Sequence, residues 1–325
     1  MSNLPTLVFV PGSWHKPICY DKIIKLLEAS HKLRCVPVTL PSTAGDPAAT
    51  FKDDLDAARE AIAAEVMQGR DVVVIAHSYG GLVGNSAVKG FTRPKHTAAS
   101  SSTLTQTSTG SDNQAPAAGH VIGIILIASG FNLTGMSFMD PFLGNPPPSW
   151  RVNSETGFAE LVTPPSEFFY HDVPEEEAKY WISELTPQSL KALFEGGEFS
   201  YSGWMDVPAW YIGTIEDRGL PVLMQRMNLG VARGMGAHVE HREIQASHSP
   251  FLSRPEETAG YVVDAIESFT RQRLEQSPIR GRDNKAVLPA ARLWQPLTWF
   301  KFGLPLLLGR AIGKAVLAFW WVRGL

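Results

Sequence analysis

Short runs of consecutive apolar residues recur along the chain and alternate with stretches whose apolar residues have helical spacing. The runs long enough for a strand are residues 6–10, 71–78, 121–129 and 208–215, and two further extended segments cover 34–41 and 238–246. The helical stretches are residues 20–31, 51–69, 80–89 and 255–274. Apolar strands that alternate with helices are typical of a parallel sheet covered by helices on both faces. The sequence therefore predicts an α/β fold.

Three segments interrupt this alternation. Residues 95–119 are rich in Ser, Thr, Gly and Ala and nearly uncharged, which predicts a disordered insertion. Residues 131–207 separate two strands and are too long for a plain connection, so we expect a helical lid over the sheet. Residues 277–325 form a basic, hydrophobic tail outside a domain of residues 1–276.

Composition adds limits on location and partners. The chain has 325 residues and a net charge of −3, which gives no reason to expect a nucleic-acid partner. Its two cysteines, Cys19 and Cys35, are too few for a disulfide framework and indicate an intracellular protein with reduced thiols. The N-terminus lacks the basic start of a signal peptide, so secretion is not expected.

The strongest chemical signal is Ser78, which stands where a strand turns abruptly into a helix. Ala76 and Gly80 flank it in the pattern small-x-Ser-x-Gly, which is typical of a nucleophile elbow. Such a turn lifts the serine hydroxyl above the sheet and leaves the N–H of Tyr79 facing the same space. We therefore expect Ser78 to be a nucleophile and the Tyr79 N–H to be one donor of an oxyanion hole.

A serine nucleophile needs a base and an acid that orients the base. His248 lies in the loop just beyond the last predicted strand, whereas His238 and His241 lie at the start of that strand, away from Ser78. The strand 208–215 ends in Glu216 and Asp217, and either carboxylate is able to bond the imidazole N–H. His248 is therefore the predicted base, with Asp217 and Glu216 as candidates for the acid.

The loop after the first strand is the expected source of a second oxyanion donor. Gly12 precedes Ser13 in that loop, so the N–H of Ser13 is the predicted partner of the Tyr79 N–H. No phosphate-binding loop or convincing metal-ligating cluster is found in the sequence, and we expect no metal or organic cofactor.

Together these residues resemble the α/β-hydrolase superfamily, in particular its branch of plant methyl-ester esterases, hydroxynitrile lyases and their fungal and bacterial relatives. The resemblance covers residues 5–270 and rests on the elbow at 77–81, the segment 216–221 and the histidine loop around His248. In that branch an aspartate in the position of Asp217 is the acid. The resemblance implies an α/β-hydrolase fold, a mostly parallel central sheet with a helical lid, and a Ser78–His248–Asp217 triad.

The activity that the resemblance implies is cleavage of an ester, lactone or thioester through an acyl-enzyme, as in the secondary metabolism of fungal relatives. The lyases carry a lysine directly after the histidine, whereas this chain has Ser249, which disfavours a hydroxynitrile-lyase activity. Pro11 also replaces the usual histidine of the oxyanion loop. A ligand receptor that keeps its triad but turns over little substrate is the alternative from another functional class.

Aromatic residues near these motifs indicate a hydrophobic substrate. Trp14 follows the predicted oxyanion residue, His77 precedes Ser78, and Phe168 and Trp181 belong to the lid. These four are the predicted substrate contacts, although packing of the lid onto the core explains aromatic residues equally well.

The tail has a charge opposite to that of the body. Residues 277–325 carry eight Lys or Arg and one Asp, among apolar and aromatic residues. Such a segment is typical of a helix that lies on an anionic membrane surface, and residues 286–325 are the predicted contact. A spanning helix would bury Arg310 and Lys314, and docking on the body or on a second subunit is the remaining alternative. The oligomeric state is left open.

Overall fold

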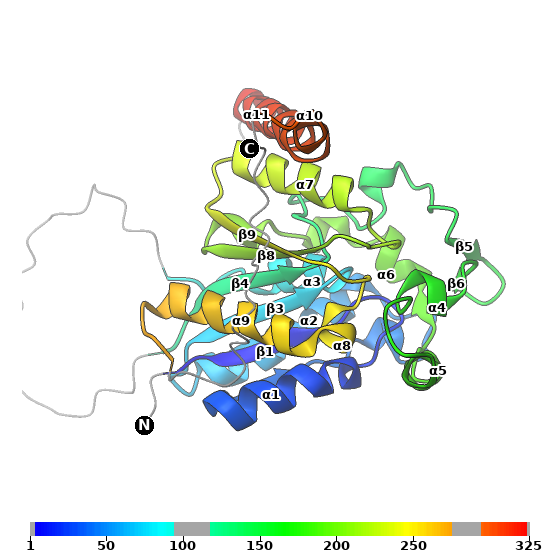
Figure 1. Cartoon of the computed structure of the whole chain (residues 1–325), viewed down its shortest axis with the longest axis horizontal. Helices are drawn as coiled ribbons and strands as arrows, with labels where there is room; N and C mark the ends of the chain where they lie inside the picture. The colour runs from blue at the N-terminus through cyan, green and yellow to red at the C-terminus, as the bar shows by residue number, and fades with distance from the viewer. Residues whose placement is uncertain (1–3, 94–117, 275–293, 324–325) are drawn as a thin grey trace, which may run out of the picture.

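The computed structural model describes residues 4–93, 118–274 and 294–323. Within these ranges, six parallel strands form a central sheet in the order β2-β1-β3-β4-β8-β9 (Figure 1). The strands are β1 (Thr6–Val10), β2 (Cys35–Pro37), β3 (Val72–His77), β4 (Val121–Ile127), β8 (Ala209–Thr214) and β9 (Val239–Ile244). All six were predicted, and so was their parallel arrangement.

The apolar runs form strands because both faces of the sheet are covered. Every residue of β1, β3 and β8 is buried, as expected for strands without a solvent-facing side. Helices α1 and α9 lie against one face and α2 and α3 against the other (Figure 1). The covering helices are α1 (Asp21–His31), α2 (Phe51–Val66), α3 (Gly80–Ala87), α7 (Val222–Gly234), α8 (Pro250–Ser253) and α9 (Pro255–Thr270).

The lid between β4 and β8 is more mixed than the predicted helical lid. Its helices are α4 (Pro165–Phe168), α5 (Glu175–Ser183) and α6 (Leu190–Phe194), and its short 3₁₀ turns are Asp140–Phe142, Gly197–Phe199 and Gly203–Met205. A small antiparallel sheet of β5 (Trp150–Asn153), β6 (Phe158–Leu161) and β7 (Gln188–Ser189) was not predicted. Two further 3₁₀ turns, Pro17–Tyr20 and Pro41–Thr43, follow β1 and β2.

The tail is helical where the structure describes it. It contains α10 (Pro296–Thr298), a π-helical turn (Trp299–Gly303) and α11 (Leu304–Arg323). Helix α11 packs along α7 on the outside of the body (Figure 1). Contact with the body, one of the three alternatives for the tail, is therefore present. The predicted insertion 95–119 lies outside the described residues, except for its last two positions.

One carboxylate links the amino ends of three of the six strands. Glu65, at the end of α2, accepts hydrogen bonds from the Thr6 hydroxyl (2.8 Å) and from the guanidinium groups of Arg34 (3.0 Å) and Arg70 (2.5 Å). These three residues stand at or just before the starts of β1, β2 and β3. Burial alone would raise the pKa of Glu65, but the three donors outweigh it and lower the pKa to about 2.

This arrangement predicts a pH-dependent loss of stability in Glu65→Gln. We expect the free energy of unfolding to fall by about 1–3 kcal/mol at pH 7, because a charged acceptor of several donors is lost. The stabilisation is complete above pH 4.5 and disappears as the pH falls towards 2, since the native carboxylate protonates there. Urea unfolding at several pH values measures it, with Glu60→Gln, an exposed change on the same helix, as control. An equal loss in both variants would contradict the prediction.

Candidate active site

Ser78 occupies a strained corner between β3 and α3. Its φ angle is 50°, a left-handed conformation that is costly for a residue with a side chain. A Cβ on Gly80 would lie 2.3 Å from the carbonyl oxygen of Pro11, and one on Gly81 would lie 1.9 Å from the Ser129 hydroxyl. Both positions therefore require glycine, because the loop after β1 and the end of β4 press directly against the turn. The Ser129 hydroxyl also donates to the Ser78 carbonyl oxygen (2.6 Å).

The structure brings His248 and Asp217 together at this edge of the sheet. His248 lies beyond β9 and Asp217 beyond β8, and the imidazole Nδ1–H donates to Asp217 Oδ2 over 2.8 Å. Both side chains are buried, and His248 lines the same cavity as Ser78. The bond to Asp217 leaves Nε2 of His248 as the nitrogen that is free to take a proton.

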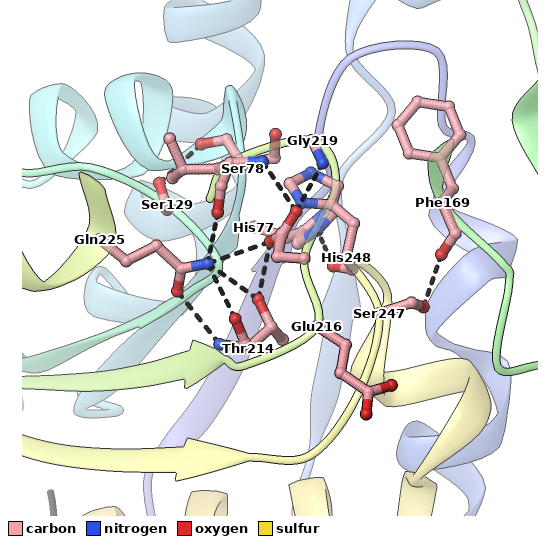
Figure 2. Close-up of polar contacts among 12 residues, drawn as sticks. His77, Ser78, Ser129, Phe169, Thr214, Glu216, Gly219, Gln225, Ser247 and His248 are labelled. Carbon is pink, nitrogen blue, oxygen red and sulfur yellow. Dashed lines mark hydrogen bonds and ion pairs between the residues drawn. The ribbon is translucent and has the colours of Figure 1, made fainter. Parts of the chain in front are cut away.

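Asp217 is fixed by four further donors. The N–H groups of Gly219 and Leu220 donate to Oδ1, each over 2.7 Å. The Thr214 hydroxyl (2.7 Å) and the Gln225 amide (3.1 Å) donate to Oδ2. Of these donors, Figure 2 labels Thr214 at the end of β8, Gly219 in the following loop and Gln225 of α7, which lie close together. Sequence analysis missed Thr214 and Gln225, because a single polar residue on a strand or helix carries no sign of its partner.

Glu216, the other candidate acid, points away from the imidazole. Its side chain is exposed and accepts a hydrogen bond from the Gln245 amide (Figure 2). Its backbone carbonyl oxygen lies 2.9 Å from His171 Nε2, at the edge of the lid. The geometry therefore favours Asp217 over Glu216.

Two other histidines, His77 and His15, lie near His248 and are uncharged at neutral pH. His77 Nε2–H donates to the His248 carbonyl oxygen (2.9 Å), and burial, followed by the neighbouring rings of His248 and His15, lowers the pKa of His77 well below its usual range. Burial likewise lowers the pKa of His15 to about 4. His15 Nδ1–H donates to the Ser13 carbonyl oxygen (2.7 Å), and the Tyr170 hydroxyl donates to Nε2 (2.8 Å). At neutral pH these rings act as hydrogen-bonding supports for the loops at the site.

The predicted oxyanion residues lie on either side of the corner. Ser13 borders the cavity, and Tyr79 follows Ser78 with its side chain buried and its hydroxyl bonded to Asp54 Oδ2 (2.7 Å). Among the backbone hydrogen bonds of the described residues, none uses the N–H of Ser13 or of Tyr79. This is a requirement of the predicted oxyanion role, in which both N–H groups bond an oxygen atom of the substrate.

The cavity is apolar and has a volume of about 440 Å³. Trp14 and Phe168 line it, as the sequence analysis expected, and Phe169 lies beside them. Two predicted contacts need correction. His77 is fully buried behind His248, and Trp181 packs inside the lid, where its Nε1–H donates to Glu177 (2.7 Å); neither lines the cavity.

Several cavity residues were not foreseen from the sequence. The lid adds Phe138, Phe142 and Trp150, α7 adds Met224, Met227, Asn228 and Val231, and the tail helix adds Ile312 and Val316. Among the residues that the structure describes, no group of three His, Cys, Asp or Glu is placed to hold a metal ion.

The sheet order, the corner and the loops that carry Asp217 and His248 define an α/β hydrolase. The family model described as the alpha/beta hydrolase family matches residues 7–261, and the chain belongs to that family. The family and fold predicted from the sequence are confirmed. An α/β hydrolase of the fungus Aspergillus novofumigatus, nvfD, is 25% identical over 257 residues, which cover 78% of this chain and 92% of the relative.

Solved structures show the same fold at lower sequence identity. A pyrethroid hydrolase from Sphingobium faniae matches with a TM-score of 0.59 and 17% identity, over 82% of this chain and 99% of its own. Polyneuridine aldehyde esterase matches with a TM-score of 0.56 and 20% identity, over 81% and 99% of the two chains.

The geometry predicts that the two neighbouring carboxylates differ sharply in their effect on serine reactivity. Asp217→Asn should slow the labelling of Ser78 by a fluorophosphonate by about 10²–10⁴-fold, because the imidazole loses the acceptor that holds its tautomer. Glu216→Gln, its matched control, should change the rate by less than about twofold, since that carboxylate does not reach His248. Intact mass spectrometry over time gives both rates. Equal slowing in the two variants would contradict the assignment.

Proposed function

We propose that this hydrolase cleaves carboxylic esters through an acyl-enzyme formed on Ser78. The observation that carries the proposal is the corner at Ser78, which borders the same cavity as a histidine held by a buried aspartate. A strained turn of this kind serves to present a nucleophile.

In the proposed reaction, each step uses a side chain or backbone N–H group of the site. Ser78 Oγ attacks the ester carbonyl carbon while His248 Nε2 takes the hydroxyl proton, and Asp217 stabilises the imidazolium. The N–H groups of Ser13 and Tyr79 stabilise the negative oxygen of the tetrahedral intermediate. When the intermediate collapses, His248 returns the proton to the leaving alcohol. Water then attacks the acyl-enzyme by the same route, releases the acid and restores Ser78.

The lining of the cavity supports a small hydrophobic ester, lactone or thioester as the substrate. Trp14, Phe168 and Phe169 surround the reacting groups, and a cavity of about 440 Å³ is within the range of small-molecule sites. The names of two solved relatives, a pyrethroid hydrolase and polyneuridine aldehyde esterase, are consistent with this class. A hydroxynitrile-lyase activity has no support, because Ser249 stands where the lyases carry lysine.

Ser78→Ala tests the function directly. The purified wild-type protein should hydrolyse p-nitrophenyl acetate or butyrate and should take up one fluorophosphonate group per chain. The variant should lose the labelling and at least about 10³-fold of kcat/KM, because the nucleophile is gone. A folded wild-type protein that neither labels nor hydrolyses these esters would overturn the proposal and leave a ligand-binding role for the cavity.

We also propose that the outer face of α11 rests on an anionic membrane surface. The helix Pro296–Arg323 is long and apolar enough to cross a membrane. Only 22% of its most apolar 18-residue stretch is buried against the rest of the protein. Its exposed large apolar residues include Leu304, Leu307, Leu308, Phe319, Trp321 and Val322. Arg310, Lys314 and Arg323 lie among them, and residues 294–323 contain no Asp or Glu.

The packing of α11 favours a position in the plane of the membrane surface. The helix contacts α7 along its length, so insertion across a bilayer would carry α7 with it or break the contact. A helix with exposed apolar residues and basic side chains binds at the headgroup level and prefers anionic lipid.

Vesicle sedimentation tests this proposal. The full chain should pellet with phosphatidylcholine vesicles that contain 30% phosphatidylserine, and high salt should weaken the binding because the screened charges contribute less. Leu308→Gln/Trp321→Gln should lower the partition coefficient by at least about tenfold, since two exposed apolar side chains are lost. Met67→Gln, an exposed apolar position on the body, is the control and should change nothing. Protein that stays in the supernatant at low salt would contradict membrane binding.

A further inference from the structure

The tail helix contributes to the cavity that contains the reacting groups. Ile312 and Val316 of α11 line it together with Ser78 and His248. Met227 and Val231 of α7 lie on the same cavity, beside the two tail residues. The family match covers residues 7–261, so it includes α7 and excludes α11. The part of the cavity formed by Ile312 and Val316 therefore comes from a segment outside the matched region.

Helix α11 packs so closely on α7 that its contact positions leave no room for a side chain. A Cβ on Gly309 would lie 2.1 Å from the Met227 carbonyl oxygen, and one on Gly313 would lie 2.3 Å from that of Val231. Across the contact, a Cβ on Gly230 would lie 3.0 Å from the Gly309 Cα. Gly234 meets α11 in the same way, since a Cβ there would lie 2.5 Å from the Arg310 carbonyl oxygen.

The glycines fix one register between the helices. Gly230 faces Gly309 and Gly234 faces Gly313, so both pairs are four residues apart and the helices run parallel. Glycines at this spacing let helix backbones touch, which increases their van der Waals contact. A slip by one turn keeps only one pair and brings side chains against backbone. The register therefore determines which residues of α11 reach the cavity.

A buried ion pair of the body provides an independent anchor for the tail. Arg226 of α7 is 3% exposed and Glu243 of β9 is 1% exposed, and two guanidinium nitrogens donate to the carboxylate, each over 2.8 Å. The third nitrogen, Nη1, donates to the Lys301 carbonyl oxygen over 2.9 Å. The Phe302 ring lies 3.5 Å from the guanidinium carbon. The tail thus covers an arginine that would otherwise be a partly unsatisfied charge at the surface.

From these contacts we propose that α11 is a specificity-determining wall of the active site. Val316, together with Ile312, which also keeps 46% of its surface exposed, contacts the apolar part of the bound substrate and limits its size. The inference rests on the ester-hydrolase function proposed above, and it assigns the tail a role in substrate choice. The reacting groups lie on other elements, so changes in this wall alter which ester is cleaved without removing the chemistry.

The test is a pair of neighbouring substitutions in the full chain. Val316→Phe fills the cavity, whereas Ala315→Phe adds the same side chain at an exposed position that does not line it. We expect Val316→Phe to lower kcat/KM for p-nitrophenyl decanoate at least about tenfold more than it lowers kcat/KM for the acetate. Ala315→Phe should leave both values unchanged. An unchanged decanoate-to-acetate ratio in Val316→Phe would overturn the proposal.

A second variant covers the case in which Val316→Phe does not fold. Val316→Ala enlarges the cavity, so it should raise the ratio of dodecanoate to acetate hydrolysis by at least about threefold. A ratio equal to that of the wild type would overturn the proposal.

A binding experiment separates this inference from the proposed function. In a Ser78→Ala background, methyl decanoate should raise the melting temperature, and the rise should disappear with Val316→Phe and persist with Ala315→Phe. If the wild-type protein hydrolyses no ester but the melting temperatures show this difference, α11 still limits what the cavity binds. In that case only the proposed ester-hydrolase function is wrong. Equal rises in melting temperature in Ser78→Ala/Val316→Phe and Ser78→Ala/Ala315→Phe would overturn the role proposed for α11, whether or not the wild-type protein is active.

Discussion

The arrangement of the site depends on how tightly the chain turns at Ser78. A side chain in the left-handed conformation costs about 1–2 kcal/mol, so neighbouring segments must hold it there. Pro11 and Ser129 do so by pressing against Gly80 and Gly81, where no Cβ fits. The same contacts bring the loop after β1 and the end of β4 to the serine. Close packing at one corner thus gathers elements that lie far apart in the sequence.

The loops of Asp217 and His248 are joined to each other and to the lid. The Ser247 hydroxyl donates to the Phe169 carbonyl oxygen (2.7 Å), and the Ser247 N–H donates to Asp172 Oδ2 (3.0 Å). Trp14 links the opposite side, where its Nε1–H donates to the carbonyl oxygen of Ala159 in β6 (3.0 Å). The lid is therefore bonded to the same loops that carry His248 and Ser13.

Local patterns explain which features could be predicted from the sequence. Four of the six strands are continuous apolar runs, and β2 and β9 are more polar extended segments that the alternation with helices still indicated. Pattern and spacing also pointed to Ser78 and His248, whereas the choice of Asp217 over Glu216 came from the family resemblance. Helix α7 was not predicted, because Gly230 and Gly234 weaken its helical pattern. Those glycines are explained only by α11, whose contacting glycines lie 79 residues further along the chain. The short strands β5 and β6 and the direction of Trp181 likewise depend on tertiary contacts that carry no local signal.

The contact between α7 and α11 also bears on how this chain should be divided for study. A fragment that stopped at residue 261 would contain all six strands and the residues around Ser78, but it would cut α9 in the middle. It would nevertheless expose the Arg226–Glu243 pair, uncover two helical glycines and remove Ile312 and Val316 from the cavity. Such a fragment would therefore differ from the whole chain in an opened cavity and in a surface of α7 that the tail covers. For this protein the smallest unit that retains the whole cavity extends beyond the region matched by its family.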